Sequence, residues 1–172
     1  MEALDQIIAA RAPESAPLES AFLQEAGATS FVVLSAAGEL YAIEIGSVRE
    51  IIRVPKVTWL PGAPANIPGI INLRGVVVAV VDLAVMLSRP PLETDDGSRI
   101  VIVESAGQPV GLLVESVAGV EEIDPSAQEE VMRTLDEVQR AFIASQAEIG
   151  GRLAGILDIG RLVEGARPSA AE

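Results

Sequence analysis

Short runs of β-branched and other aliphatic residues, each closed by a turn signal, extend from residue 31 to residue 163 of this chain. The first runs occupy 31–34, 41–45 and 48–54, and Gly38 separates the first two as a hairpin turn would. Aromatic residues make up only 3% of the chain, so a core must be built from Val, Ile, Leu and Ala. Because β-branched residues favour strands, the sequence predicts an all-β fold with short helices.

The middle of the chain adds a second predicted hairpin and a first predicted helix. Runs at 70–73 and 76–81 flank Arg74-Gly75, which predicts a tight reversal. Asp82 precedes the short apolar stretch 83–87 and is expected to cap a helix there. Before this hairpin, a loop without regular structure is predicted from four prolines, Pro55, Pro61, Pro64 and Pro68.

The second half of the chain repeats this plan. A shift of 69 positions places Gly38 on Gly107, and a shift of 76 positions places Asp82 on Asp158. Five short strands per half suit a small closed barrel, which leaves few exposed edges. Two such barrels would share an apolar seam and leave a groove at its margin, where peptides or helices bind. We interpret the pattern as an internal duplication with barrel halves at roughly 30–87 and 99–163.

The additional positions in the second half are predicted to form an inserted helix within 124–140. Asp124 is the expected N-cap and Pro125 lies in the expected first turn. Ser126 and Glu129 have the spacing of a capping box. The apolar face of this helix is expected to be formed by Val131, Leu135 and Val138.

Charge and the ends of the chain limit the classes of partner. The net charge is −13, which repels phosphate backbones and anionic lipid, so we expect neither nucleic acid binding nor direct membrane contact. The longest apolar run, 76–81, is far shorter than the roughly 20 residues of a membrane helix. We expect a cytoplasmic protein without a signal peptide, with a flexible extension at 1–29, a domain at 30–165 and a tail at 166–172.

The chain offers little for catalysis. It contains no cysteine and no histidine, which removes thiolate nucleophiles, the usual zinc ligands and the commonest general base. Adjacent carboxylates at Asp95-Asp96 and Glu121-Glu122 are better explained as a hydrated surface than as an acid/base pair. We therefore predict no enzyme activity, no catalytic residue, no metal site and no cofactor.

The most unusual segment is 69–75, where Arg74 lies at a reversal between two apolar strands. Gly69 and Gly75 frame it, which indicates a tightly specified backbone. Glu50 is the expected charge partner of Arg74. The sequence leaves open whether the pair is solvent-exposed or half-buried, and the two cases differ strongly in what removal of one partner would cost.

These residues resemble CheW-like domains. The stretch Gly69-Ile-Ile-Asn-Leu-Arg-Gly75, followed by Val-Val-Asp-Leu83, is similar to the family's G-[VI]-[IV]-N-L-R-G signature. The resemblance extends over about 31–163 and includes Val48-Arg-Glu-Ile-Ile52 and Pro109-Val-Gly-Leu-Leu-Val-Glu-Ser-Val117. It implies two intertwined five-stranded SH3-like barrels, with strands exchanged between the halves.

The resemblance also implies a function without catalysis. Such domains bind the cytoplasmic tip of methyl-accepting chemoreceptors and the regulatory domain of a CheA-type histidine kinase, at membrane-associated receptor arrays. The residues that match the family's partner-binding surface are Val48, Glu50, Ile51, Gly69, Asn72, Arg74, Gly75, Val114 and Val117.

Three alternatives remain open at this stage. One is an adaptor of a specialised chemosensory branch such as pilus motility. Another is a small-molecule-binding double barrel in which Trp59 and Tyr41 line a pocket. The third is an enzyme that works through carboxylates alone.

Overall fold

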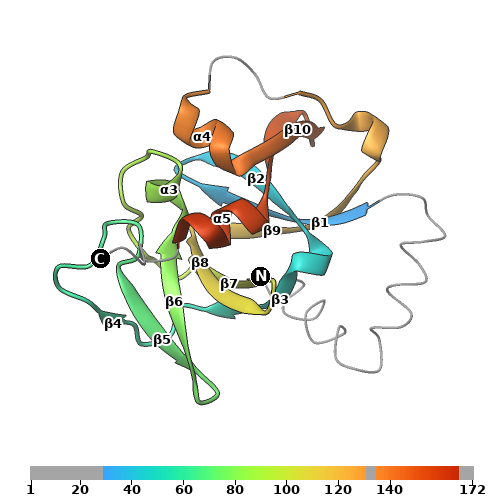
Figure 1. Ribbon diagram of the computed structural model, residues 1–172. Helices are drawn as coiled ribbons and strands as arrows, with labels where there is room; N and C mark the ends of the chain where they lie inside the picture. The colour runs from blue at the N-terminus through green and yellow to red at the C-terminus, as the bar shows by residue number, and fades with distance from the viewer. Residues whose placement is uncertain (1–28, 131–134, 167–172) are drawn as a thin grey trace.

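Two β-sheets with a few short helices form the body of the protein in the computed structural model (Figure 1). The structure describes residues 29–130 and 135–166. The expected N-terminal extension therefore lies outside the described residues except for Thr29, and the expected tail lies outside them except for Ala166. The prediction of an all-β fold with short helices is confirmed.

The strands of the described part are β1 (Thr29–Ala36), β2 (Glu39–Glu44), β3 (Val48–Arg53), β4 (Thr58–Trp59), β5 (Gly69–Leu73), β6 (Val76–Asp82), β7 (Arg99–Ser105), β8 (Gln108–Val114), β9 (Ser116–Ile123), β10 (Ile143–Ile149) and β11 (Arg152–Leu157). The helices are η1 (Ile45–Ser47), α3 (Leu83–Met86), η2 (Pro125–Ala127), α4 (Glu137–Phe142) and α5 (Ile159–Ala166).

Each sheet combines strands from both halves of the chain. The first sheet has the order β10-β11-β2-β1-β9, and the second has the order β3-β7-β8-β6-β5-β4. Strand β9 thus pairs with β1, and β3 pairs with β7 in the corresponding place. The parallel pairs β11·β2 and β6·β8 correspond in the same way. The two sheets are therefore equivalent under exchange of the halves, apart from the two-residue strand β4.

The hairpin turns repeat together with the strands. Ala37-Gly38 and Ala106-Gly107 have positive φ angles of 52° and 79°, and of 52° and 77°. Two consecutive left-handed residues are the mark of a type I′ hairpin turn, which explains the glycine in the second place. The reversal Arg74-Gly75 has φ angles of 53° and 85° and corresponds to Gly150-Gly151 at 58° and 80°. The turn conformations therefore recur in the same order in the first and second halves of the described chain.

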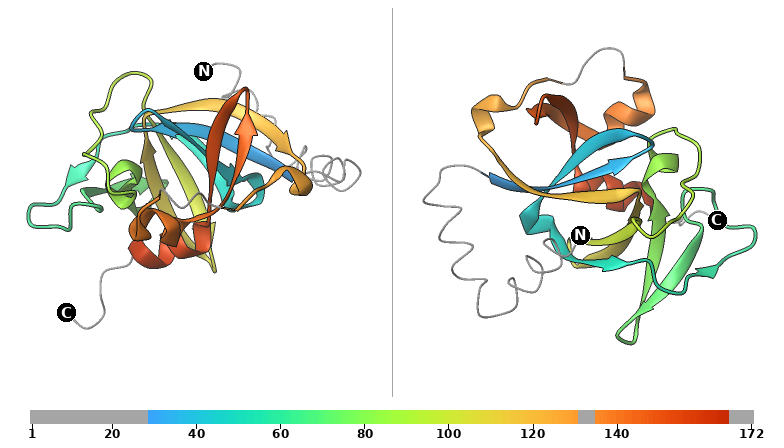
Figure 2. Two further views of the ribbon diagram at one scale, coloured as in Figure 1. Left: turned by 90° about the horizontal axis from the view of Figure 1, so that it is seen from above. Right: turned by 180° about the vertical axis from the view of Figure 1, so that it is seen from behind.

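Apolar side chains form one large core between the sheets and a smaller core inside each sheet. The large core contains residues of both sheets and the buried face of α5, which packs on β7 and β8 (Figure 2). In the second sheet, Ile52 of the edge strand β3 packs into the same cluster as Ile71 of β5. Because β3 and β5 lie near opposite edges, the second sheet must curl around its own interior.

A β-bulge in β3 directs its side chains. The register shifts between Val48 and Glu50, so Arg49 is the extra residue. Val48 and Ile51 both enter the large core as a result, although three positions separate them. The bulge leaves Glu50 partly exposed on the other face.

The predicted helix starting at Asp124 is wrong. Asp124 accepts a hydrogen bond from the amide of Ser126, but only the single turn η2 follows. Glu129 then forms a β-bridge with Gln146, so the chain is extended there instead of helical. The helix in this region is α4, which begins after Asp136 and has a capping box between Asp136 and Gln139. Val131, one of the predicted apolar positions, lies outside the described residues.

The proline-rich loop contains one feature that its prolines did not predict. The short strand β4 pairs with the start of β5, where Trp59 lies opposite Gly69. A Cβ atom on Gly69 would lie 2.5 Å from the carbonyl oxygen of Thr58 and 2.8 Å from Cγ1 of Val57. Gly69 is therefore required by close approach of the backbone.

Tyr41 links the large core to a polar contact between β2 and the segment after α3. Its hydroxyl donates to Glu39 at 2.9 Å, and Glu39 also accepts from Arg89 at 2.6 Å. Burial, followed by the hydrogen bond and the charge of Glu39, raises the pKa of Tyr41 well above its ordinary range.

We predict that Gly69→Ala lowers the free energy of unfolding by roughly 1–3 kcal/mol, because the added methyl group overlaps the backbone of Thr58. Urea denaturation measures the change. The matched control is Gly46→Ala, since an added Cβ there meets no atom within 4 Å. Equal stability of the two variants would contradict the requirement at Gly69.

A second prediction concerns alkaline pH. A raised pKa in the folded state means that Tyr41 contributes its full stabilisation below the unfolded pKa of about 10, and that this contribution is lost as pH rises above it. Tyr41 is the only tyrosine, so tyrosinate absorbance follows this group alone. We expect ionisation well above pH 10, together with a stability that falls less steeply there in Tyr41→Phe. Ionisation of folded protein at the ordinary pKa would refute this.

Candidate partner-binding site

The ion pair predicted between Arg74 and Glu50 is present. Nη1 of Arg74 donates to Oε2 of Glu50 at 2.5 Å, and Nη2 donates to Oε1 at 2.9 Å. This two-pronged arrangement is geometrically specific. The side chain of Arg74 is 75% exposed and that of Glu50 is 19% exposed. The pair therefore lies at the surface, with its carboxylate largely covered.

The position of the pair in the sheet gives it a structural consequence. Arg74 lies in the turn of the β5–β6 hairpin, which projects from the body in Figure 1, and Glu50 lies on β3. Strand β3 is one edge of the second sheet, and β5 is next to the other edge. The ion pair thus joins the two sides of the curled sheet. The hydrogen bond with Glu50 also raises the pKa of Arg74, so the guanidinium stays charged.

Asn72 and Gly75 hold the turn that displays Arg74. The amide of Gly75 donates to Oδ1 of Asn72 at 2.8 Å. Arg74 itself has a φ of 53°, in the left-handed region that favours Gly and Asn over residues with long side chains. Arg74 therefore occupies a turn position whose backbone conformation Gly or Asn would adopt more easily than Arg.

Other predicted site residues lie beneath the surface. Four of them belong to the large core and are at most 6% exposed, namely Val48, Ile51, Val114 and Val117. Gly69 is buried against β4 at the far end of β5. The structure therefore brings together Glu50, Asn72, Arg74 and Gly75 at the hairpin tip, and a direct partner contact by the four valine and isoleucine side chains remains a prediction that their burial does not favour.

Exposed apolar side chains near the hairpin were not among the predicted site residues. The described part of the chain has six exposed large apolar residues, and four of them lie between the start of β4 and the start of β6: Trp59, Leu60, Val76 and Val77. The run 76–81 carried a signal for two of them, because consecutive residues of a strand point to opposite faces and cannot all enter one core. We call Glu50, Arg74, Val76 and Val77 the hairpin surface. Trp59 and Leu60 lie towards the opposite end of β5, where Trp59 pairs with Gly69.

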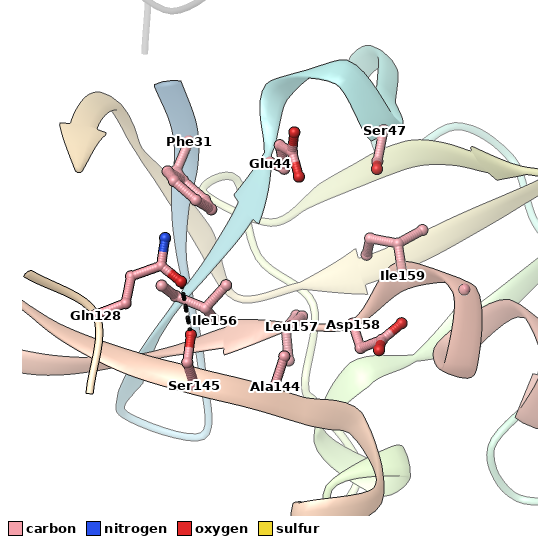
Figure 3. A pocket seen from close by; sticks show the side chains of 11 residues that line it. Phe31, Glu44, Ser47, Gln128, Ala144, Ser145, Ile156, Leu157, Asp158 and Ile159 are labelled. Atoms are coloured by element: carbon pink, nitrogen blue, oxygen red, sulfur yellow. Dashed lines mark hydrogen bonds between the residues drawn. The ribbon is translucent and has the colours of Figure 1, made fainter. Parts of the chain in front are cut away.

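Arg74 lines none of five pockets found among the described residues. One of about 380 Å³ is surrounded by β1, β2, β10, β11 and the start of α5 (Figure 3), and its lining is polar, with Glu44 and Asp158. At one side of it, Gln128 accepts a hydrogen bond from Ser145 at 3.0 Å. A groove bordered by Arg74 is thus not among these pockets.

The two aromatic residues of the small-molecule alternative do not meet. Tyr41 belongs to β2 of the first sheet and lines a pocket of about 430 Å³ with Leu40 and Leu153. Trp59 belongs to β4 at the edge of the second sheet and is 54% exposed. Within the described residues, these two side chains share none of the five pockets considered. The helices described here include none with the length and apolarity to cross a membrane.

Comparison with known proteins assigns the chain to a family. The CheW-like domain family matches residues 30–167. The chemotaxis protein CheW of Bacillus subtilis is 31% identical over 133 residues, which are 77% of this chain and 85% of that protein. Protein PilI of Pseudomonas aeruginosa is 26% identical over 106 residues, which are 62% of this chain and 60% of that protein.

A solved structure agrees with the sequence matches. The crystal structure of the scaffolding protein TtCheW from Thermoanaerobacter tengcongensis matches with a TM-score of 0.69 and 34% sequence identity, over 76% of this chain and 89% of that one. This likeness confirms the predicted CheW-like architecture. The chain therefore belongs to the CheW-like domain family.

Proposed function

We propose that this protein is a non-catalytic adaptor that couples chemoreceptors to a CheA-type histidine kinase in a bacterial chemosensory array. Similar proteins are named as chemotaxis proteins and as a scaffolding protein, which supports this reading. The observation that carries it is the hairpin surface, where a two-pronged ion pair stands next to exposed valines. Exposed apolar side chains beside a fixed charge are suited to binding another protein.

The partners follow from the same proposal. One is the cytoplasmic tip of a methyl-accepting chemoreceptor, and the other is the regulatory domain of the kinase, so the protein would act in the cytoplasm at membrane-associated arrays. Apolar side chains of a partner would cover Val76 and Val77, while Arg74 and Glu50 fix the orientation. The adaptor thereby holds receptor and kinase in a defined relative geometry, and receptor motion changes that geometry.

A second candidate is an adaptor of a specialised branch such as pilus motility. The similarity to protein PilI favours it. The two candidates differ in the receptors and kinase that bind, so parallel pull-downs with each chemosensory set of the source organism distinguish them.

We expect Arg74→Asn to weaken binding of the receptor fragment or the kinase at least about tenfold, because it removes the guanidinium from the hairpin surface. The fold should persist, since Asn tolerates the left-handed conformation at this position. Isothermal titration and a reconstituted kinase assay measure the effect.

The matched control is Arg161→Asn, which removes another exposed ion pair, with Asp158 at 3.5 Å, at the start of α5. Binding by Arg161→Asn should stay within about twofold of wild type. If Arg74→Asn couples receptor and kinase as the parent chain does, the hairpin surface is not the docking site.

Trp59 is the only tryptophan and provides an independent test. Covering an exposed indole moves its emission to shorter wavelength, so a partner that extends from the hairpin surface along β5 to β4 should shift the fluorescence of this protein. The measurement uses a partner fragment whose own tryptophans are replaced by phenylalanine. A partner that binds without any change in emission does not cover β4, which contradicts a contact that extends along β5.

A further inference from the structure

Two arginines face each other in the second sheet, away from the hairpin surface. Arg53, the last residue of β3, lies directly opposite Arg99, the first residue of β7. Directly paired residues project from the same face of a sheet, and like charges in this position are destabilising. The chain has only 12 cationic residues against 25 acidic ones, so an opposed pair of cations is not explained by composition.

Arg99 is almost entirely buried yet lacks a carboxylate partner. Its exposed fraction is 3%, and Nη1 donates to the carbonyl oxygens of Asp96 at 2.8 Å and Ser98 at 2.7 Å. Neither Arg53 nor Arg99 forms a salt bridge with any described carboxylate. A buried charge without a counter-ion is unfavourable, because the lost hydration is not replaced.

The two carbonyl contacts do not use up the guanidinium. Both come from Nη1, and Nε and Nη2 of Arg99 make no hydrogen bond with a described residue. Within the described part of the chain, the fully buried side-chain nitrogen without a partner is Nε of Arg89, so the free donors of Arg99 still reach solvent. Arg99 therefore holds the 96–98 loop through Nη1 alone, and its nitrogens Nε and Nη2 remain available as donors.

Arg99 also lines a pocket of about 560 Å³. Its lining consists of Arg53, Val54, Asp95, Asp96, Ser98 and Arg99. One oxygen of Asp95, Oδ1, accepts hydrogen bonds from the amide of Gly97 and the hydroxyl of Ser98 in the loop. The cavity thus combines two guanidinium groups with two nearby acidic residues.

We infer that this pocket binds a carboxylate group, held between Arg53 and Arg99. A planar guanidinium matches a carboxylate with two parallel hydrogen bonds, and a carboxylate between Arg53 and Arg99 would relieve the repulsion between these two cations. A phosphate dianion fits less well, because Asp95 and Asp96 line the same cavity. The carboxylate belongs either to a small free acid or to an acidic side chain of a partner protein, and both present the same chemistry.

Nuclear magnetic resonance of the arginine Nε–Hε groups in the full-length chain tests this site. Sodium acetate, a blocked Gly-Glu-Gly peptide and inorganic phosphate are titrated separately against sodium chloride of equal ionic strength. We expect saturable shifts at Arg53 and Arg99 with acetate or the peptide. Binding of acetate points to a free acid, whereas binding of the peptide alone points to a partner side chain.

Arg53→Gln is the decisive variant, because Arg53 is exposed and its loss leaves the core unchanged, whereas a change at the buried Arg99 risks unfolding. It should weaken carboxylate binding roughly tenfold, and it should raise the melting temperature without ligand by removing the like-charge contact. The control is Arg152→Gln on β11 of the first sheet. The guanidinium of Arg152 donates to the carbonyl of Gly38 in the β1–β2 turn of that same sheet.

Three results would each overturn the inference. They are shifts no larger than those caused by sodium chloride, undiminished binding in Arg53→Gln, and tighter binding of phosphate than of either carboxylate. None of these depends on whether the hairpin surface couples receptors to a kinase.

Discussion

The exchange of strands between the two halves is the constraint on which the rest of the structure depends. Strand β9 completes the first sheet beside β1, and β3 completes the second sheet beside β7. Neither sheet can be built from one half alone, and the largest apolar core lies between them. The hairpin surface inherits this arrangement, because Glu50 lies on the exchanged strand β3 while Arg74 lies on the β5–β6 hairpin. Its geometry is therefore set by the whole domain.

Features specified by neighbouring residues were predictable from the sequence. The turns at Gly38 and at Arg74-Gly75 need positive φ angles, and a glycine as the second residue of the turn predicts them. Asp82 caps α3 through the amide of Val85, as its place before an apolar stretch predicts. The Arg74–Glu50 pair was also predicted, because its two residues are unusual in their local settings.

Features that depend on strand register could not be predicted in the same way. The bulge at Arg49 places Val48 and Ile51 in the core, and simple alternation does not show it. The opposition of Arg53 and Arg99 likewise arises only from the pairing of distant strands. Asp124 caps a helix as predicted, but the predicted length of that helix is wrong. The β-bridge between Glu129 and Gln146 ends it after one turn.

The exposure of Arg74 bears on what the ion pair does. In water, the attraction between exposed charges is weak, so the pair by itself adds little to the closure of the second sheet. A partner that covers Val76 and Val77 would exclude water from the neighbouring pair and strengthen that attraction. Because the pair joins opposite sides of the curled sheet, binding at the hairpin would then tighten the sheet itself. If the proposed docking site is correct, partner binding and the geometry of the second sheet would be linked, a property suited to an adaptor between moving partners.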